Sequence, residues 1–212
     1  MYYPHFQAKR LKVSGEGNIS VAPDQVNITI GAITEKKSLQ QAQEENARII
    51  SNVIAALVEL GIPKDQIQTV IYRIDTMYDY QDGRQIFRGY QVTHQLLVKI
   101  NQIELTGQVV DLAVSQGANS VSNIEFTVVH PEAYYNEALK IALQNAYQKA
   151  LTLTSQLPVN LNPVPYKIED FSQVISPPVP LATTMLAKAE ATPIQPGEIT
   201  ITATIIAHYF YC

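Results

Sequence analysis

Alternating apolar and polar positions predict two strands at the start of the chain. The first spans residues 11–21 and is interrupted by Gly15-Glu16-Gly17. After a Pro-Asp pair, a second run places the apolar residues of 26–32 at every other position, which is typical of a half-buried strand. Glycine inside a strand pattern usually marks a bulge, so we expect a bulge at 15–17 in preference to a backbone nest that binds an anion.

Three segments carry apolar residues at the spacing of an α-helix. The first, 39–60, is preceded by Ser38, which with Gln41 forms a predicted capping box. The second falls within 101–117, and the third runs from 131 to about 157 with proline in its first turn. Small residues recur in the third helix at every fourth position: Ala138, Ala142, Ala146 and Ala150. Another element is therefore expected to approach that stripe closely.

Two long runs with period-two alternation, 70–80 and 90–100, surround an Asp82-Gly83 turn. They predict a long β-hairpin that protrudes from the core. Further strands are expected at three places: 124–128, 164–171 and 199–207. A Pro-rich loop is expected at about 176–196, because proline has no backbone N–H for a ladder. The order is then ββαββαβαββ, which favours an α+β fold with helices packed on a mostly antiparallel sheet.

The length and the hydrophobic content of the chain are sufficient for a folded domain with its own core. The chain has 212 residues, of which 46% are hydrophobic and 16% charged. A chain of this length can build a core without disulfides or metal ions. We expect a polar N-terminal segment at 1–10 and a single domain over 11–212.

Charge and cysteine usage argue against a nucleic-acid-binding protein and against a fold held by internal disulfides. The net charge of -4 lacks the positive field that phosphate-backbone binding needs, so nucleic acid is not an expected partner. Cys212 is the single cysteine and makes no internal disulfide. No apolar run has the length of a transmembrane helix or of a signal peptide's apolar region. The expected compartment is cytoplasmic as the sequence stands, and periplasmic or secreted if the chain is a trimmed form.

Several blocks of the sequence resemble one family over roughly residues 11–210. They include VSGEGNISVAPDQVNITIGAIT, YDYQDGRQIFRGYQVTHQLLVKI, GANSVSNIEFTVVHPEAYYNEAL and PGEITITATI. Together they resemble the SIMPL-domain family, also called YggE-like or periplasmic immunogenic protein-like. The resemblance implies an α+β fold, homo-oligomers that are ring- or channel-like in relatives, and a link to oxidative-stress or envelope biology. Mammalian members are signalling adaptors. The family brings no catalytic residue set.

His94 is the histidine most in need of a test, because its ring lies on the apolar face of a predicted strand. The other histidines, His5, His130 and His208, do not fall at a metal-ligand spacing such as HxxxH. A metal or general-base role needs several convergent groups. The preferred interpretation of His94 is therefore a structural or interface histidine.

Acidic and nucleophilic residues also have local explanations. The acidic pairs are Glu44 with Glu45, Asp79 with Asp82, and Glu132 with Glu137. They suit a solvated helix face, a turn and the positive end of a helix dipole. No GxSxG motif is present, and the only thiol lies at the last position. No catalytic residue, metal ligand or cofactor is assigned, and the chain is expected not to be an enzyme.

Three functions remain after these exclusions. The first is a non-enzymatic protein that forms homo-oligomers through its hairpin, with an interface at Tyr78, Tyr80, Phe87 and Tyr90. Tyrosine is favoured at subunit interfaces, and a long hairpin exposes unpaired backbone groups. The second is a binding or adaptor module for a small ligand or an unidentified partner protein. The third is an uncharacterised enzyme, which would need a pocket with convergent polar groups.

Overall fold

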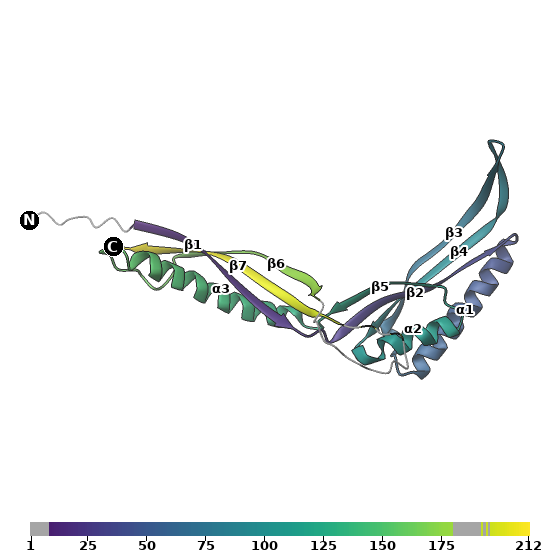
Figure 1. The fold of residues 1–212 in the computed structure, drawn as a ribbon, viewed down its shortest axis with the longest axis horizontal. Helices are drawn as coiled ribbons and strands as arrows, with labels where there is room; N and C mark the ends of the chain where they lie inside the picture. Colours follow the sequence, from purple (N-terminus) through teal and green to yellow (C-terminus); the bar gives the residue numbers. More distant parts are fainter. Residues whose placement is uncertain (1–8, 180–191, 193, 195) are drawn as a thin grey trace, which may run out of the picture. The chain divides into compact units, whose positions relative to one another are not determined.

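A computed structural model describes residues 9–179, 192, 194 and 196–212. Its elements follow the order ββαββαβαββ (Figure 1). The fold is α+β with antiparallel sheets, as the sequence predicts. The described residues divide into two compact units, one formed by 9–22, 128–179 and 197–212, and the other mainly by 23–127. The expectation of a single domain over 11–212 stays a prediction.

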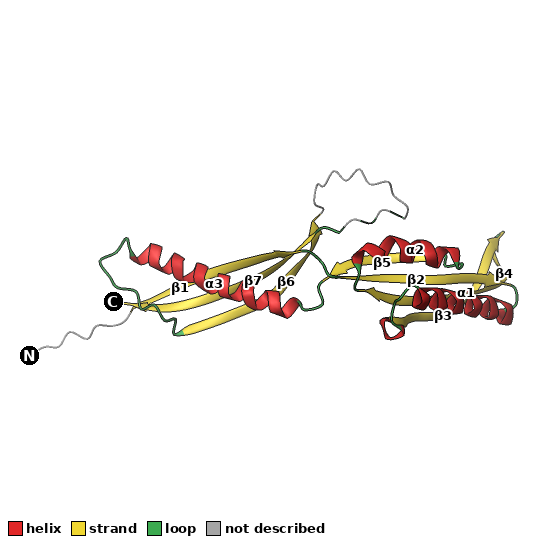
Figure 2. Ribbon diagram, turned by 90° about the horizontal axis from the view of Figure 1, so that it is seen from below, coloured by secondary structure: helices red, strands yellow, loops and turns green. Residues whose placement is uncertain are grey.

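The first unit is a three-stranded antiparallel sheet with one helix. The strand order is β1-β7-β6. The strands are β1 (Lys9–Val21), β6 (Lys167–Val179) and β7 (Glu198–Tyr211), and the helix is α3 (Pro131–Thr154). Figure 2 shows α3 lying along this sheet. Odd-numbered residues of β7, from 199 to 209, are buried on the side of the helix, because alternate residues of a strand share one face.

Gly15 and Gly17 allow β1 to lie directly against α3. The register of β1 with β7 runs unbroken from Lys9 opposite Tyr211 to Val21 opposite Ile199. The bulge expected at 15–17 is therefore wrong. A Cβ atom on Gly15 would lie 1.9 Å from the carbonyl oxygen of Ala142. The physical reason for glycine is close approach to the helix backbone.

The alanine stripe of α3 is the other half of this contact. Ala138, Ala142, Ala146 and Ala150 are all fully buried. The prediction that another element approaches this stripe is confirmed, and the element is the glycine-containing strand β1.

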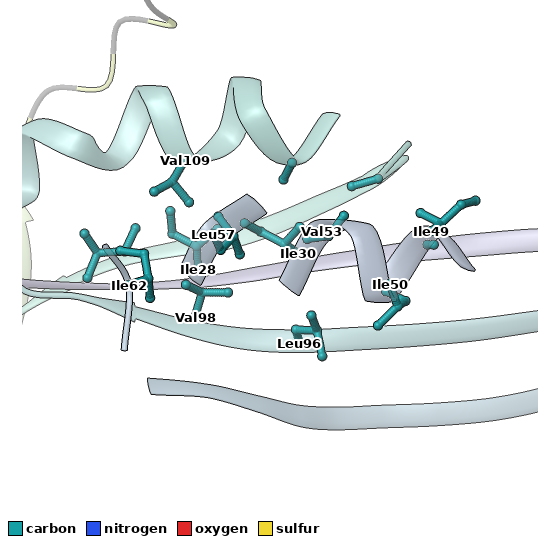
Figure 3. Packing of buried hydrophobic residues seen from close by; sticks show 14 of the residues in the cluster. Ile28, Ile30, Ile49, Ile50, Val53, Leu57, Ile62, Leu96, Val98 and Val109 are labelled. Atoms are coloured by element: carbon teal, nitrogen blue, oxygen red, sulfur yellow. The ribbon is translucent and has the colours of Figure 1, made fainter. Parts of the chain in front are cut away.

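The second unit is a four-stranded antiparallel sheet in the order β3-β4-β2-β5. The strands are β2 (Gln25–Lys36), β3 (Ile67–Gln81), β4 (Arg84–Ile100) and β5 (Ser120–Thr127). The helices are α1 (Leu39–Glu59) and α2 (Thr106–Ser115), with short 3-10 turns at Lys64–Gln66 and Ile103–Leu105. Both helices pack on the same apolar core (Figure 3).

The core of the second unit follows the predicted patterns. Figure 3 shows Ile28 and Ile30 of β2, Leu96 and Val98 of β4, and side chains of α1 and α2 meeting between the sheet and the helices. Asn46 is the buried polar exception on α1. Its Nδ2 donates to the carbonyl oxygens of Ala32 and Val92, at 2.9 and 3.1 Å. These two bonds join α1 to both β2 and β4.

Several element boundaries differ from the expectation. Ser38 is the N-cap of α1 but its side chain makes no cap hydrogen bond, so the predicted capping box is not formed. Strand β6 begins at Lys167 and reaches Val179, so the first part of the expected 176–196 loop is strand. Most of the remaining loop lies outside the described residues. Pro131 is in the first turn of α3, as predicted.

Candidate functional site

The β3–β4 hairpin is the longest paired element of the second unit. Figure 1 shows its tip projecting away from α1 and α2. Asp82 and Gly83 form the turn, with φ angles of 49° and 75°. Both angles are positive, which is the requirement of the tight hairpin turns that Asp-Gly favours. The hairpin and its turn are therefore where the sequence places them.

Two register shifts in the hairpin were not foreseen. One lies between Thr69 and Ile71, and the other between Met77 and Tyr78. At the second shift, Tyr78 pairs with Phe87, whereas Met77 pairs with Gly89. Residue 88 is thus the extra residue of a β-bulge, and such a bulge increases the local twist of the ribbon.

Three of the four predicted interface residues meet in one aromatic row. The rings of Tyr78 and Phe87 are 6.2 Å apart, and those of Phe87 and Tyr90 are 5.3 Å apart, both in edge-to-face geometry. Tyr80 continues the row, and its hydroxyl accepts a hydrogen bond from Gln85 Nε2 at 2.7 Å. The exposed fractions of Tyr78, Tyr80 and Phe87 are 46%, 71% and 47%. We call Tyr78, Tyr80, Phe87 and Tyr90 the aromatic face.

The opposite face of the hairpin is ionic. Arg88 makes a two-pronged contact with Glu35, at 2.5 Å from Nε and 2.6 Å from the terminal nitrogen, and lies 3.7 Å from Asp79. Arg73 Nε contacts Asp75 at 2.6 Å. Because residues alternate along a strand, Asp75 and Asp79 face away from the tyrosines at even positions. The Glu35 carboxylate raises the pKa of Arg88 above its ordinary value, chiefly through the hydrogen bond and then through charge attraction.

The hairpin also carries a free sheet edge. Strand β3 is the outermost strand of its sheet, so one side of its backbone has no partner strand among the described residues. Apolar side chains of β3 are exposed along this edge: Val70, Ile71, Tyr72 and Ile74. Soluble proteins usually shorten, charge or cover such an edge, because it can pair with another chain.

His94 lies on the helix side of β4, beside the base of the hairpin. Its Nε2 is 2.9 Å from the Thr69 hydroxyl, and its ring meets the Tyr72 ring edge-on at 5.2 Å between centroids. Gln43 of α1 donates to the Tyr72 hydroxyl at 3.2 Å. Partial burial lowers the pKa of His94 below its ordinary value. The partner of His94 is thus a threonine on the neighbouring strand.

The remaining candidate residues lie apart from one another. His130, at the start of α3, contacts Glu132 at 3.3 Å. His208 of β7 lies 3.6 Å from Glu169 of β6. His5 lies outside the described residues. Cys212 is exposed and its thiol is free. In the described part of the chain, no group of three or more His, Cys, Asp or Glu side chains lies where it could hold a metal ion.

The carboxylates of the two acidic pairs on the helices have separate contacts. Glu44 accepts from Gln40 at 2.9 Å, and Glu45 binds Lys36 at 2.9 Å. Glu137 binds Lys140 at 2.6 Å. A pair of catalytic carboxylates needs both groups to face one cleft, and these carboxylates face different partners.

Sequence reasoning found the aromatic face and missed its surroundings. Glu35 and Arg88 are 53 positions apart and Thr69 and His94 are 25 apart. Their meeting depends on strand register, which alternation alone does not give. Arg88 lies before the alternating run at 90–100, so the alternation gave no signal for its contact with Glu35.

The chain belongs to the SIMPL family. The family model, described as "Protein of unknown function (DUF541)", matches residues 11–209. The chain is similar to the 26 kDa periplasmic immunogenic protein of Brucella melitensis, with 29% identity over 205 residues that cover 91% of this chain and 80% of the relative. It is also similar to the uncharacterized protein YggE of Escherichia coli (strain K12), with 27% identity over 188 residues, 87% of this chain and 74% of the relative.

None of the helices in the described part of the chain is both long and apolar enough to cross a membrane.

Proposed function

We propose that the protein is a non-enzymatic assembly protein, whose copies associate through the aromatic face and the free β3 edge of the β3–β4 hairpin. The single observation that carries this proposal is the uneven hairpin: one face carries the ion pairs, while the other exposes an aromatic row without charged side chains in it. Solvated ion pairs need no partner. Exposed aromatic rings gain free energy when a second surface removes them from water.

The free β3 edge also favours a second copy of the chain as the partner. A second copy of the chain carries an identical hairpin, so the two edges can satisfy one another's backbone N–H and C=O groups while the aromatic faces pack. Such a contact has the composition of subunit interfaces, which are enriched in Tyr and Phe and depleted of Lys and Glu. The family match spans the hairpin, and the family description leaves the molecular role open.

Hydrogen exchange at two protein concentrations tests which edge is used. We expect the amides of β3 to exchange more slowly at high concentration than at low concentration, because association covers them. Strand β5 is the matched control, since it is the other edge of the same sheet. Protection of β5 in place of β3, or exchange that is independent of concentration, would contradict the proposed interface.

The absence of enzymatic chemistry is part of the proposal. It is supported by the separate partners of the acidic side chains and by the threonine partner of His94. We expect a chelator such as EDTA to leave both the melting temperature and the mass of the purified protein unchanged. Stoichiometric metal in the purified protein, together with a fall in melting temperature after its removal, would contradict this part of the proposal.

The compartment is a further part of the proposal. The Brucella relatives carry the name periplasmic immunogenic protein. By this likeness we propose that the present chain also works in the periplasm. Fractionation of the source cells with an antibody against the chain tests this point, and recovery in the cytoplasmic fraction would favour the compartment expected from the sequence as it stands.

A further inference from the structure

One end of the first unit gathers positive charge, although the chain as a whole is acidic. Strands β1 and β6 begin there and β7 ends there, because Lys9 pairs with Tyr211 and Lys167 pairs with His208. Figure 2 shows the start of β1 beside the end of β7. The exposed cations at this end are Lys9, Arg10, Lys12 and Lys167. We call these four side chains the basic end.

Acidic residues of the same segments do not balance the basic end. Residues 9–14, 155–168 and 207–212 contain no Asp or Glu, whereas the whole chain has 19 of them against 15 Lys and Arg. Glu169 follows in β6, where it contacts Lys167 and neutralises that one cation. The end therefore attracts a negative partner, although the net charge of the whole chain, -4, disfavours one.

The strand register places two of these cations on one face of the sheet. Lys12 of β1 and Lys167 of β6 are both register partners of His208, which lies between them on β7. Their backbones are about 10 Å apart, since neighbouring strands are separated by about 4.8 Å. Arg10 shares this face with Lys12 because alternate residues of a strand point the same way. Three cations can therefore act on one flat partner.

Exposed apolar side chains lie directly beside the basic end. They belong to the connection 155–166 between α3 and β6, which is tied to β7 where Tyr166 N–H donates to the His208 carbonyl at 2.9 Å. Leu157, Val164 and Tyr166 are 52%, 67% and 41% exposed. Lysine on an edge strand can serve only to discourage pairing with other chains, but that role does not account for apolar residues next to it.

Tyr166 joins the apolar residues to the cations. Its ring stacks on the ring of Phe210, with 4.2 Å between the centroids and 20° between the planes. The guanidinium carbon of Arg10 lies 5.8 Å from the centre of the Tyr166 ring. Tyrosine is enriched where a hydrocarbon layer meets water, because its ring is apolar and its hydroxyl is polar. Its place between cations and apolar side chains suits that boundary.

We propose that the basic end and the connection 155–166 bind the surface of an anionic phospholipid membrane, where Leu157 and Val164 enter the layer between headgroups and acyl chains and the cations contact lipid phosphates. Cations alone would suit any polyanion. Exposed apolar side chains gain free energy only from a partner that also offers an apolar layer, and a lipid surface offers both. The hairpin of the second unit plays no part in this contact.

The first test is cosedimentation of the full chain with lipid vesicles. We expect binding to vesicles of phosphatidylglycerol mixed with phosphatidylcholine, weak binding to phosphatidylcholine alone, and release as salt rises from about 50 to about 500 mM. Lys9→Gln combined with Lys12→Gln should weaken binding about tenfold or more, since each cation near such a surface contributes about fivefold. Lys37→Gln combined with Lys64→Gln is the matched control, because it changes two exposed lysines of the second unit. Equal weakening by both pairs would overturn the proposed surface.

A tryptophan reporter tests which residues enter the lipid. The chain has no tryptophan of its own. The emission of Val164→Trp should shift to shorter wavelength on anionic vesicles and be quenched by brominated acyl chains. Val58→Trp on α1, at a position 42% exposed, should show neither effect. Melting temperatures close to that of the wild type check that both variants are folded, and equal quenching at the two positions, or none at 164, would overturn the proposal.

Soluble heparin separates a lipid surface from a polyanion without acyl chains. We expect no shift in the emission of Val164→Trp when heparin is added. Binding to heparin without binding to anionic vesicles would overturn lipid as the partner, as would failure to bind vesicles at low salt. Equal binding to neutral and anionic vesicles would overturn the role given to the cations.

Discussion

Gly15 shows how one missing side chain sets the distance between a strand and a helix. An added Cβ would lie 1.9 Å from the Ala142 carbonyl oxygen and 2.8 Å from the Ala146 Cβ. Gly15→Ala should therefore lower the free energy of unfolding by about 1–3 kcal/mol through overpacking. Ser14→Ala, next to it on the exposed face, should change it by less than about 0.5 kcal/mol. Urea unfolding measures both, and equal stabilities would show that β1 is not in close contact with α3.

His94 gives a pH prediction whose sign follows from its environment. Its pKa in the folded chain is lowered by burial, so the unfolded chain binds the proton more readily. Stability should then fall as the pH drops below about 6.5, the ordinary histidine value, toward the folded pKa. His94→Gln should show a smaller fall over this window, since glutamine does not titrate. Parallel melting-temperature profiles from pH 8 to about 5 for both proteins would show that His94 makes no contribution.

The same two residues mark the limit of sequence reasoning at this scale. The sequence pointed to the glycines and to the face on which His94 lies. It gave the wrong reason for the glycines, because the alanine stripe they contact is about 125 positions away. It could not name Thr69 as the partner of His94, because a bulge at 69–71 sets the register that brings them together.

At the scale of elements, helices and strands were predictable wherever local patterns were strong. The Asp82-Gly83 turn and the alternation of β3 and β4 defined the hairpin, and the element order followed. Bulges were not predictable, because an extra residue changes the pairing without changing the composition of the strand. The second bulge is the one that allows Tyr78, Phe87 and Tyr90 to form one row.

Substitutions on the two faces of the hairpin test which face forms the contact between copies. Phe87→Ser removes the central ring of the aromatic face, whereas Ile86→Ser removes an apolar side chain of similar exposure from the opposite face. We expect Phe87→Ser to reduce the mass of the assembly at micromolar concentration, and Ile86→Ser to keep the wild-type mass. Sedimentation velocity measures the change, and circular dichroism checks that both variants are folded. A larger effect of Ile86→Ser would place the contact on the ionic face.

At the scale of the whole molecule, sequence gave the fold class and the family but not the division into two units. That division arises because β1 and β7, from opposite ends of the chain, pair with one another. Alternation identifies both strands and says nothing about which strand each one joins. The pairing of β1 with β7 depends on the topology of the whole fold, and local sequence patterns do not predict it.

Self-association is the central claim, and the mass of the wild-type protein in solution tests it most directly. Light scattering at micromolar concentration and physiological salt should give an integer multiple of the 23.5 kDa chain, at least twice that value. The salt dependence should be weak, because apolar contacts are not screened as ion pairs are. A mass of 23.5 kDa that stays constant over the accessible concentration range would contradict the account.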